Sequence, residues 1–216
     1  MIRIITVERE YGSQGAEFAH YLAKRLQWKL IDQCLVDEIA QKAGVTTTLV
    51  KNCDERLDPW YYRLGKAFWH GSIERLPALP DTEVFDSERM VQFVRDYLRQ
   101  AAGQGRCVVV GRGAGLALTG VSGVFNVFIY ASLKRKIQWF EEHFPEHAKE
   151  AEQEIIATDK RRAAYVRQFY QQEWSDRRLY HLMMNSCMGC DAMVKATIEA
   201  AALTSEVRAD QEAHVV

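Results

Sequence analysis

Residues that could bind a phosphate group follow the first apolar run of the chain. Ile2 to Val7 is typical of a short buried strand, and the turn E-R-E-Y-G-S-Q-G separates it from a helical pattern beginning at Ala16. A turn between a strand and a helix directs backbone N–H groups and the helix N-terminus at one point. The cradle residues would be Gly12, Ser13, Gln14 and Gly15. The sequence therefore predicts a phosphate-binding loop, with an ordinary structural turn as the alternative.

The loop lacks the lysine that a phosphate loop of the form G-x-x-x-x-G-K-[ST] carries. When strand and helix are aligned, Gly15 stands at the lysine position and Gln14 at the second glycine. Glu17 stands where a hydroxyl group would bind magnesium. Arg9, at the start of the turn, is the nearest cation. We predict that Arg9 supplies the charge that the absent lysine would have supplied.

Two further candidates stand directly after predicted strands. Asp32 follows the strand Lys29–Ile31 and could accept hydrogen bonds from a nucleotide, or could cap the helix predicted over Leu35–Ala43. Arg112 follows Cys107–Gly111 within the sequence G-R-G-A-G. Its guanidinium could hold a phosphate with two parallel hydrogen bonds, or form a buried ion pair.

A fourth candidate is the basic triplet Lys160, Arg161 and Arg162. Successive residues on a helix point about 100° apart, so these three side chains cannot all face one ligand unless the segment moves or ends there. A solvent-exposed charged face is one interpretation. A mobile lid that brings cations over a transferring phosphoryl group is the other.

The elements that must position these residues predict an α/β protein. Short apolar strands, each followed by a helical pattern, favour a parallel sheet covered on both faces, and ligands of such sheets bind at the carboxyl ends of the strands. Helices are expected from Ala16, from Asp86 or Ser87, from Ser132, over about 146–173 and over Ala192–Ala202. The remaining strands are expected at Val124–Ala131 and Leu179–Asn185.

Composition narrows the classes of function. The 216 residues are 48% hydrophobic and 26% charged, and the net charge of −1 argues against broad binding to nucleic acids or membrane surfaces. No apolar run approaches a membrane span, and no export signal is apparent. Five scattered cysteines, including the pair Cys187 and Cys190 without a second pair of ligands, favour reduced thiols in the cytoplasm over a zinc site.

Taken together, these segments resemble the cytidylate kinase-like family. The resemblance rests on R-E-Y-G-S-Q-G, W-K-L-I-D-Q-C, V-V-V-G-R-G-A-G, V-F-I-Y-A-S and the long segment beginning D-K-R-R-A-A-Y, in that order. It implies a P-loop kinase fold: a three-layer α/β/α domain over residues 1–202 with a five-stranded parallel sheet. It further implies a small inserted monophosphate-binding subdomain at 46–86 and a lid at 146–176. Residues 203–216 are expected to be a frayed tail.

The resemblance implies transfer of the γ-phosphoryl group of ATP, with Mg²⁺, to a nucleotide such as CMP or dCMP. The loop would bind ATP, Asp32 and Arg112 would bind the acceptor, and Arg9 with Lys160, Arg161 and Arg162 would stabilise the transferred group. Two alternatives stay open: a nucleotide-binding sensor without turnover, which could be a homo-oligomer, and a kinase for another small acceptor. The expected binding partners are small-molecule nucleotides.

Overall fold

The computed structural model describes residues 1–32 and 81–203. The chain divides into two compact units, one formed by residues 1–32 and 98–216 and the other by residues 33–97. The predicted helix Leu35–Ala43, nearly all of the predicted inserted subdomain at 46–86, with its aromatic run, and the tail after residue 203 lie outside the described residues. All of the described strands lie in the first unit.

A five-stranded parallel sheet forms the centre of this unit, in the order β2-β3-β1-β4-β5. The strands are β1 (Ile4–Arg9), β2 (Lys29–Ile31), β3 (Cys107–Val110), β4 (Val124–Tyr130) and β5 (Leu182–Asn185). β1 is the central strand, and its last residue, Arg9, pairs with Ile129 of β4. The predicted five-stranded parallel sheet is therefore confirmed.

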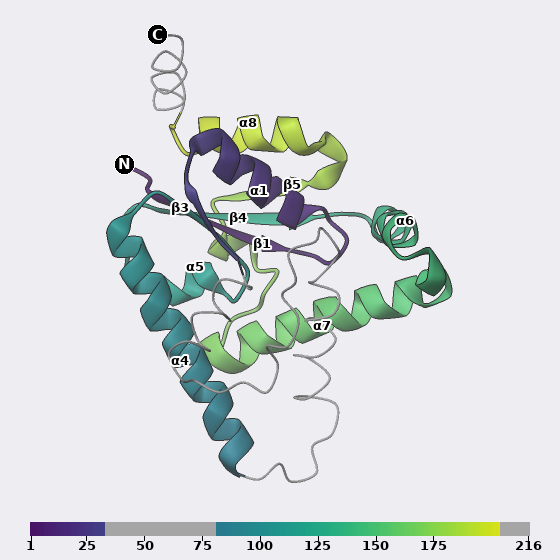
Figure 1. The fold of residues 1–216 in the computed structure, drawn as a ribbon, viewed down its shortest axis with the longest axis horizontal. Helices are drawn as coiled ribbons and strands as arrows, with labels where there is room; N and C mark the ends of the chain where they lie inside the picture. The colour runs from purple at the N-terminus through teal and green to yellow at the C-terminus, as the bar shows by residue number, and fades with distance from the viewer. Residues whose placement is uncertain (33–80, 204–216) are drawn as a thin grey trace. The chain divides into compact units, whose positions relative to one another are not determined.

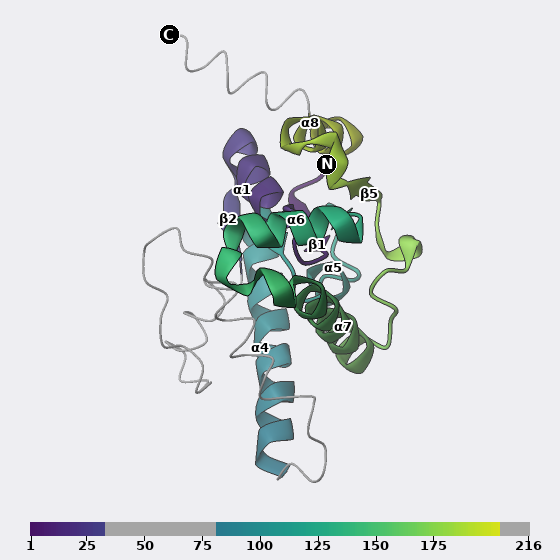
Figure 2. The same cartoon turned by 90° about the vertical axis from the view of Figure 1, so that its right-hand side faces the viewer.

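Helices cover both faces of the sheet. The described helices are α1 (Gly15–Leu26), α4 (Asp81–Gln104), α5 (Ala114–Ala117), α6 (Leu133–His143), α7 (Ala151–Tyr170) and α8 (Cys190–Ala200), of which α4 belongs to the other unit as far as residue 97. Short 3-10 helices lie at η1 (Pro145–Glu150), η2 (Arg177–Leu179) and η3 (Ser186–Met188). α1 and α8 lie on one face of the sheet, and α5 and α7 on the other, while α6 lies beyond the end of β4 (Figures 1 and 2).

Burial follows the apolar patterns of the sequence. Phe18 and Leu22 of α1 are fully buried against Ile5 and Val7 of β1 and against Met193 of α8. Removing such a buried aromatic or aliphatic side chain typically costs about 2–5 kcal/mol of folding free energy. This packing fixes the start of α1 relative to the end of β1, and so fixes the turn between them. None of the described helices is long and apolar enough to cross a membrane.

Several predicted boundaries were wrong. The helix predicted from Asp86 or Ser87 begins earlier, at Asp81, which is itself a residue that favours the start of a helix. The strand predicted from Leu179 begins at Leu182, since Leu179 is the last residue of η2 and two irregular residues follow it. The predicted start at Ser132 is confirmed: its side chain caps α6 by accepting a hydrogen bond from the Arg135 amide at 3.4 Å.

Candidate active site

The turn between β1 and α1 is tightly folded. The Ser13 hydroxyl donates hydrogen bonds to the carbonyl oxygens of Glu10 at 2.7 Å and Ile129 at 3.3 Å, and Ser13 is fully buried. Gln14 adopts a left-handed conformation with φ of 61°, which a glycine would adopt more readily. A methyl group at Gly12 would lie 3.1 Å from the Lys136 carbonyl oxygen. Glycine at position 12 therefore lets the loop pack directly on α6.

The first turn of α1 offers unpaired N–H groups. Within the described residues, the amides of Gly15, Ala16 and Glu17 have no protein acceptor. The first N–H groups of any helix lack an intrahelical partner, and the helix dipole adds partial positive charge at this end. The predicted phosphate cradle thus has the donors that an anion would need.

The Arg9 side chain fills the space that a lysine at position 15 would need. A side chain at Gly15 would collide with the Cβ of Arg9, and one at Gly111 would collide with its guanidinium. Arg9 therefore fills the space beside the lysine position and runs from the end of β1 to the end of β3. Among the described residues its guanidinium has no hydrogen-bond or ion-pair partner. Burial and the charges of Arg162 and Arg112 lower the pKa of Arg9 to about 9, against the opposing effects of Glu8 and Asp32.

Arg112 lies in a strained turn at the end of β3. It has a left-handed φ of 61°, between Gly111 and Gly113, whose φ angles are also positive. Non-glycine residues in this region are held there by their surroundings and concentrate at functional sites. The Tyr170 hydroxyl donates to the Arg112 carbonyl oxygen at 3.2 Å, and a side chain at Gly113 would lie 2.6 Å from the Tyr170 ring. The conformation of Arg112 thus depends on α7.

A buried carboxylate that the sequence reasoning did not identify supports this turn. Glu8, which is 5% exposed, accepts hydrogen bonds from the Gly113 amide at 2.9 Å and from the Trp174 indole at 3.0 Å. Its charge favours the protonated forms of both Arg9 and Arg162. Glu8 therefore holds the β3 turn and the segment after α7 against the end of β1, and partly balances the arginine charge.

The basic triplet separates as its helical spacing requires. Arg162 donates a hydrogen bond to the Arg9 carbonyl oxygen at 2.6 Å, and burial lowers its pKa. Arg161 bonds instead to Glu154 at 3.1 Å and to Thr158 at 2.7 Å, both within α7, and Lys160 is exposed. Of the three, only Arg162 lies with Arg9, Arg112 and Asp32. The functional roles of all these residues remain predictions.

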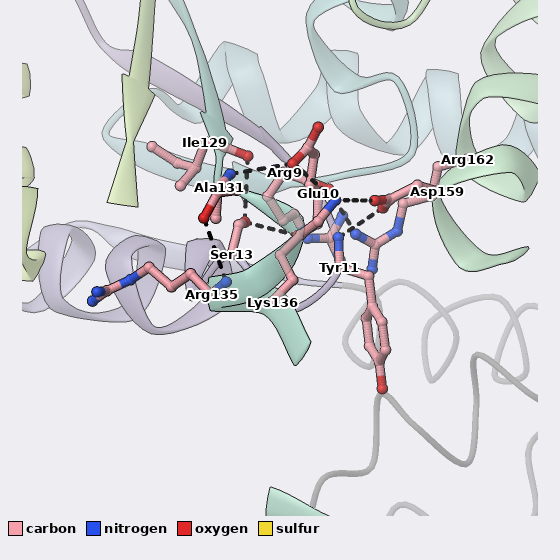
Figure 3. Close-up of polar contacts among 11 residues, drawn as sticks. Arg9, Glu10, Tyr11, Ser13, Ile129, Ala131, Arg135, Lys136, Asp159 and Arg162 are labelled. Atoms are coloured by element: carbon pink, nitrogen blue, oxygen red, sulfur yellow. Dashed lines mark hydrogen bonds and ion pairs between the residues drawn. The ribbon is translucent and has the colours of Figure 1, made fainter. Parts of the chain in front are cut away.

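A second group of charged residues, which the sequence reasoning also missed, contacts the loop: Glu10, Lys136 and Asp159 (Figure 3). The Lys136 ammonium lies 2.8 Å from Asp159 and 3.1 Å from Glu10, and it is nearly buried. The other Asp159 oxygen accepts a hydrogen bond from the Tyr11 amide at 2.7 Å. Burial opposes the charge on Lys136, but Asp159 and Glu10 more than compensate and raise its pKa. A signal existed in the sequence: Asp159 precedes Arg162 by three residues, which places both on one helix face.

The cysteine pair has no place in this site. Cys187 is exposed and Cys190 is partly buried, and both are free thiols. Within the described residues, no group of three or more His, Cys, Asp or Glu side chains is arranged to hold a metal ion.

A parallel sheet of this strand order, with a glycine-containing turn after its central strand and arginines at the carboxyl ends, is the arrangement of a P-loop kinase-like fold. The cytidylate kinase-like family model matches residues 4–187, and the chain belongs to that family. No curated protein matched the chain.

Two solved structures show the same fold. An uncharacterized protein from Eubacterium ventriosum ATCC 27560 has a TM-score of 0.68 at 20% identity, covering 93% of this chain and 98% of that chain. The shikimate kinase from Bacteroides thetaiotaomicron has a TM-score of 0.51 at 12% identity, covering 92% of this chain and 98% of that chain. At these identities the likeness concerns the fold, and it confirms the predicted P-loop kinase fold.

Proposed function

We propose that this protein transfers the γ-phosphoryl group of ATP to a small nucleotide such as CMP or dCMP. The observation that carries the proposal is the Arg9 guanidinium. It is desolvated, lies among two other arginines, and has no hydrogen-bond or ion-pair partner within the described residues. A cation that is partly removed from water and has no partner is costly to the folded protein, and a phosphate group would supply the missing negative charge. The family and the fold support a kinase-like function independently of this residue.

Each candidate residue has a distinct role in this proposal. The loop from Gly12 to Gly15 and the first amides of α1 hold the donor phosphates. Asp32 and Arg112 hold the acceptor nucleotide at the ends of β2 and β3. Arg9 lies between the donor-binding residues and the acceptor-binding residues. Together with Arg162 it stabilises the charge of the transferring phosphoryl group. Lys160 and Arg161 would join them only if α7 moved.

Mg²⁺ fits this site as a companion of the nucleotide. It needs only one or two carboxylates when phosphate oxygens and water complete its coordination. Glu10, at the phosphate loop, is a carboxylate of this kind, and it also accepts a hydrogen bond from the Ala131 amide at 3.2 Å. Bound Mg²⁺ would neutralise phosphate charge. The acceptor phosphate is already ionised and needs no strong general base.

The proposal is tested by incubating the purified protein with Mg²⁺, ATP and a panel of nucleoside monophosphates, and by measuring ADP. We expect ADP formation that depends on one acceptor, with CMP and dCMP tested first. Formation of ADP only with a small acceptor that is not a nucleotide would replace the acceptor in this proposal while retaining phosphoryl transfer. ATP binding without ADP formation from any acceptor would contradict the proposal.

That last outcome would favour the second candidate, a nucleotide-binding sensor. One observation supports it: the loop lacks both the lysine and the magnesium-binding hydroxyl, with Gly15 and Glu17 at those positions. A sensor would bind ATP and change its conformation or its oligomeric state without turnover. Sedimentation of the protein with and without ATP, in the absence of acceptor, would detect such a change of oligomeric state.

A further inference from the structure

The turn that contains the predicted phosphate cradle binds a carboxylate of the protein itself. The Asp159 carboxylate accepts a hydrogen bond of 2.7 Å from the Tyr11 amide, although the two residues are 148 positions apart. Carboxylate and phosphate oxygens are acceptors of the same kind for a loop amide, and both gain from the negative charge that they carry. Asp159 therefore occupies one N–H donor of the turn, that of the residue directly before Gly12.

The same carboxylate is part of a contact between α6, α7 and the loop. Its second oxygen accepts a hydrogen bond of 2.8 Å from Lys136, whose ammonium also contacts Glu10 at 3.1 Å. One turn further along α7, Arg162 donates to the Arg9 carbonyl oxygen at 2.6 Å. These contacts fasten α7 to the loop on one helix face (Figure 3). Glu154 and Arg161 pair elsewhere on the same helix and take no part.

We propose that Asp159 is an internal competitor for the phosphate ligand, so that binding of donor phosphates displaces its carboxylate from Tyr11 and releases this contact of α7. This inference rests on the proposed phosphate-binding function of the loop. It adds a regulatory step: in the ligand-free protein, Asp159 of α7 holds the Tyr11 amide and thereby opposes phosphate binding.

The exchange is balanced in charge. Lys136 would keep Glu10 as a partner when a phosphate oxygen replaces Asp159 at the Tyr11 amide. Because Asp159 bonds both that amide and Lys136, an anion in the same place would also be within reach of Lys136. Arg162, whose pKa is raised by the charge of Asp159 against the larger effect of burial, likewise gains a phosphate partner. The ligand would thus replace the interactions that are broken when the carboxylate leaves. Displacing Asp159 costs free energy, so the ligand binds less tightly than it would without Asp159.

The test measures binding of inorganic tripolyphosphate by isothermal titration calorimetry, without and with Mg²⁺. The variants are Asp159→Ala, Asp159→Asn and the matched control Glu154→Gln. We expect Asp159→Ala to bind about tenfold more tightly than the wild type, the factor typical of one charge-assisted hydrogen bond. Asp159→Asn keeps an acceptor without the charge and should fall between the two, while Glu154→Gln should match the wild type.

Equal or weaker binding by a folded Asp159→Ala would overturn the inference, and weaker binding only with Mg²⁺ would instead identify Asp159 as a metal ligand. If wild type and variants alike fail to bind, the proposed function fails too. A measurement on the wild type covers the case of an unfolded variant. Tripolyphosphate should shift the carboxyl ¹³C resonance of Asp159 while the Tyr11 amide stays protected from hydrogen exchange, and an unmoved Asp159 resonance in the bound protein would refute the displacement.

Discussion

Replacing Arg9 by methionine should make the protein more stable and a weaker binder of phosphates. Methionine retains the aliphatic contact with Gly15 and removes a charge that has no hydrogen-bond or ion-pair partner within the described residues. The pKa of Arg9 is lowered from 12.5 to about 9. Each tenfold change in a protonation equilibrium is worth about 1.4 kcal/mol. The lowered pKa therefore corresponds to a free-energy cost of keeping Arg9 charged in the folded protein. Because solvent reaches part of the side chain, we expect only roughly 1–2 kcal/mol of that cost to appear as added unfolding free energy in the variant.

The loss of affinity follows from the same charge. A hydrogen bond to a charged group contributes about 1.5–3 kcal/mol, so the dissociation constant for ATP should rise roughly 10- to 100-fold. Urea denaturation and calorimetric titration measure the two effects. The control is Arg3→Met, since Arg3 is exposed and lies just before the opposite end of β1. A less stable Arg9→Met variant with unchanged ATP affinity would show that Arg9 has a structural role, and the reasoning would be refuted.

Four further predictions concern the same site. As the pH rises through about 9, Arg9 loses its proton, so tripolyphosphate affinity should fall more steeply for the wild type than for Arg9→Met in titrations across that range. Over the same range the unfolded chain binds more protons than the folded one, so the stability of the wild type relative to Arg9→Met should rise, and a constant difference in urea denaturation would contradict the shifted pKa. Restoring the lysine with Gly15→Lys should lower both stability and ATP affinity because Arg9 fills that space, whereas tighter ATP binding would show that the space is available. Lys136→Met leaves Glu10 and Asp159 without their shared cation and should cost roughly 2–4 kcal/mol of unfolding free energy, against little change for the exposed control Lys134→Met.

The sheet could be predicted because its information is local. Apolar runs such as Cys107–Val110 are buried at every position, and α1 shows its buried stripe at Phe18, Leu22 and Leu26. The beginning of α4 could not be placed, because Asp81, Asp86 and Ser87 are all residues that can start a helix. Boundaries of this kind depend on the competition between neighbouring residues of similar preference.

The candidate site could be predicted only in part. The positions of Arg9, Asp32 and Arg112 follow from a topological rule, since the carboxyl ends of parallel strands meet at one edge of the sheet. The roles of Glu8, Lys136 and Asp159 do not follow from any such rule. Their partners lie 105 to 166 positions away for Glu8, 126 and 23 positions away for Lys136, and 148 positions away for the Tyr11–Asp159 bond. The packing of α6 and α7 on the loop brings Lys136 and Asp159 together there, while the partners of Glu8 come from the turn after β3 and from the segment after α7.

The central claim, that this loop supports phosphoryl transfer through Arg9 in place of a lysine, is tested most directly by one rate measurement. The protein is mixed with Mg²⁺, ATP labelled with ³²P at the γ position and the best acceptor from the panel, and the label on the acceptor is followed over time. We predict transfer by the wild type and by Arg3→Met, and transfer at least about 100-fold slower by Arg9→Met, since both donor binding and stabilisation of the transferred group are lost. Equal rates of transfer in wild type and Arg9→Met would contradict the claim.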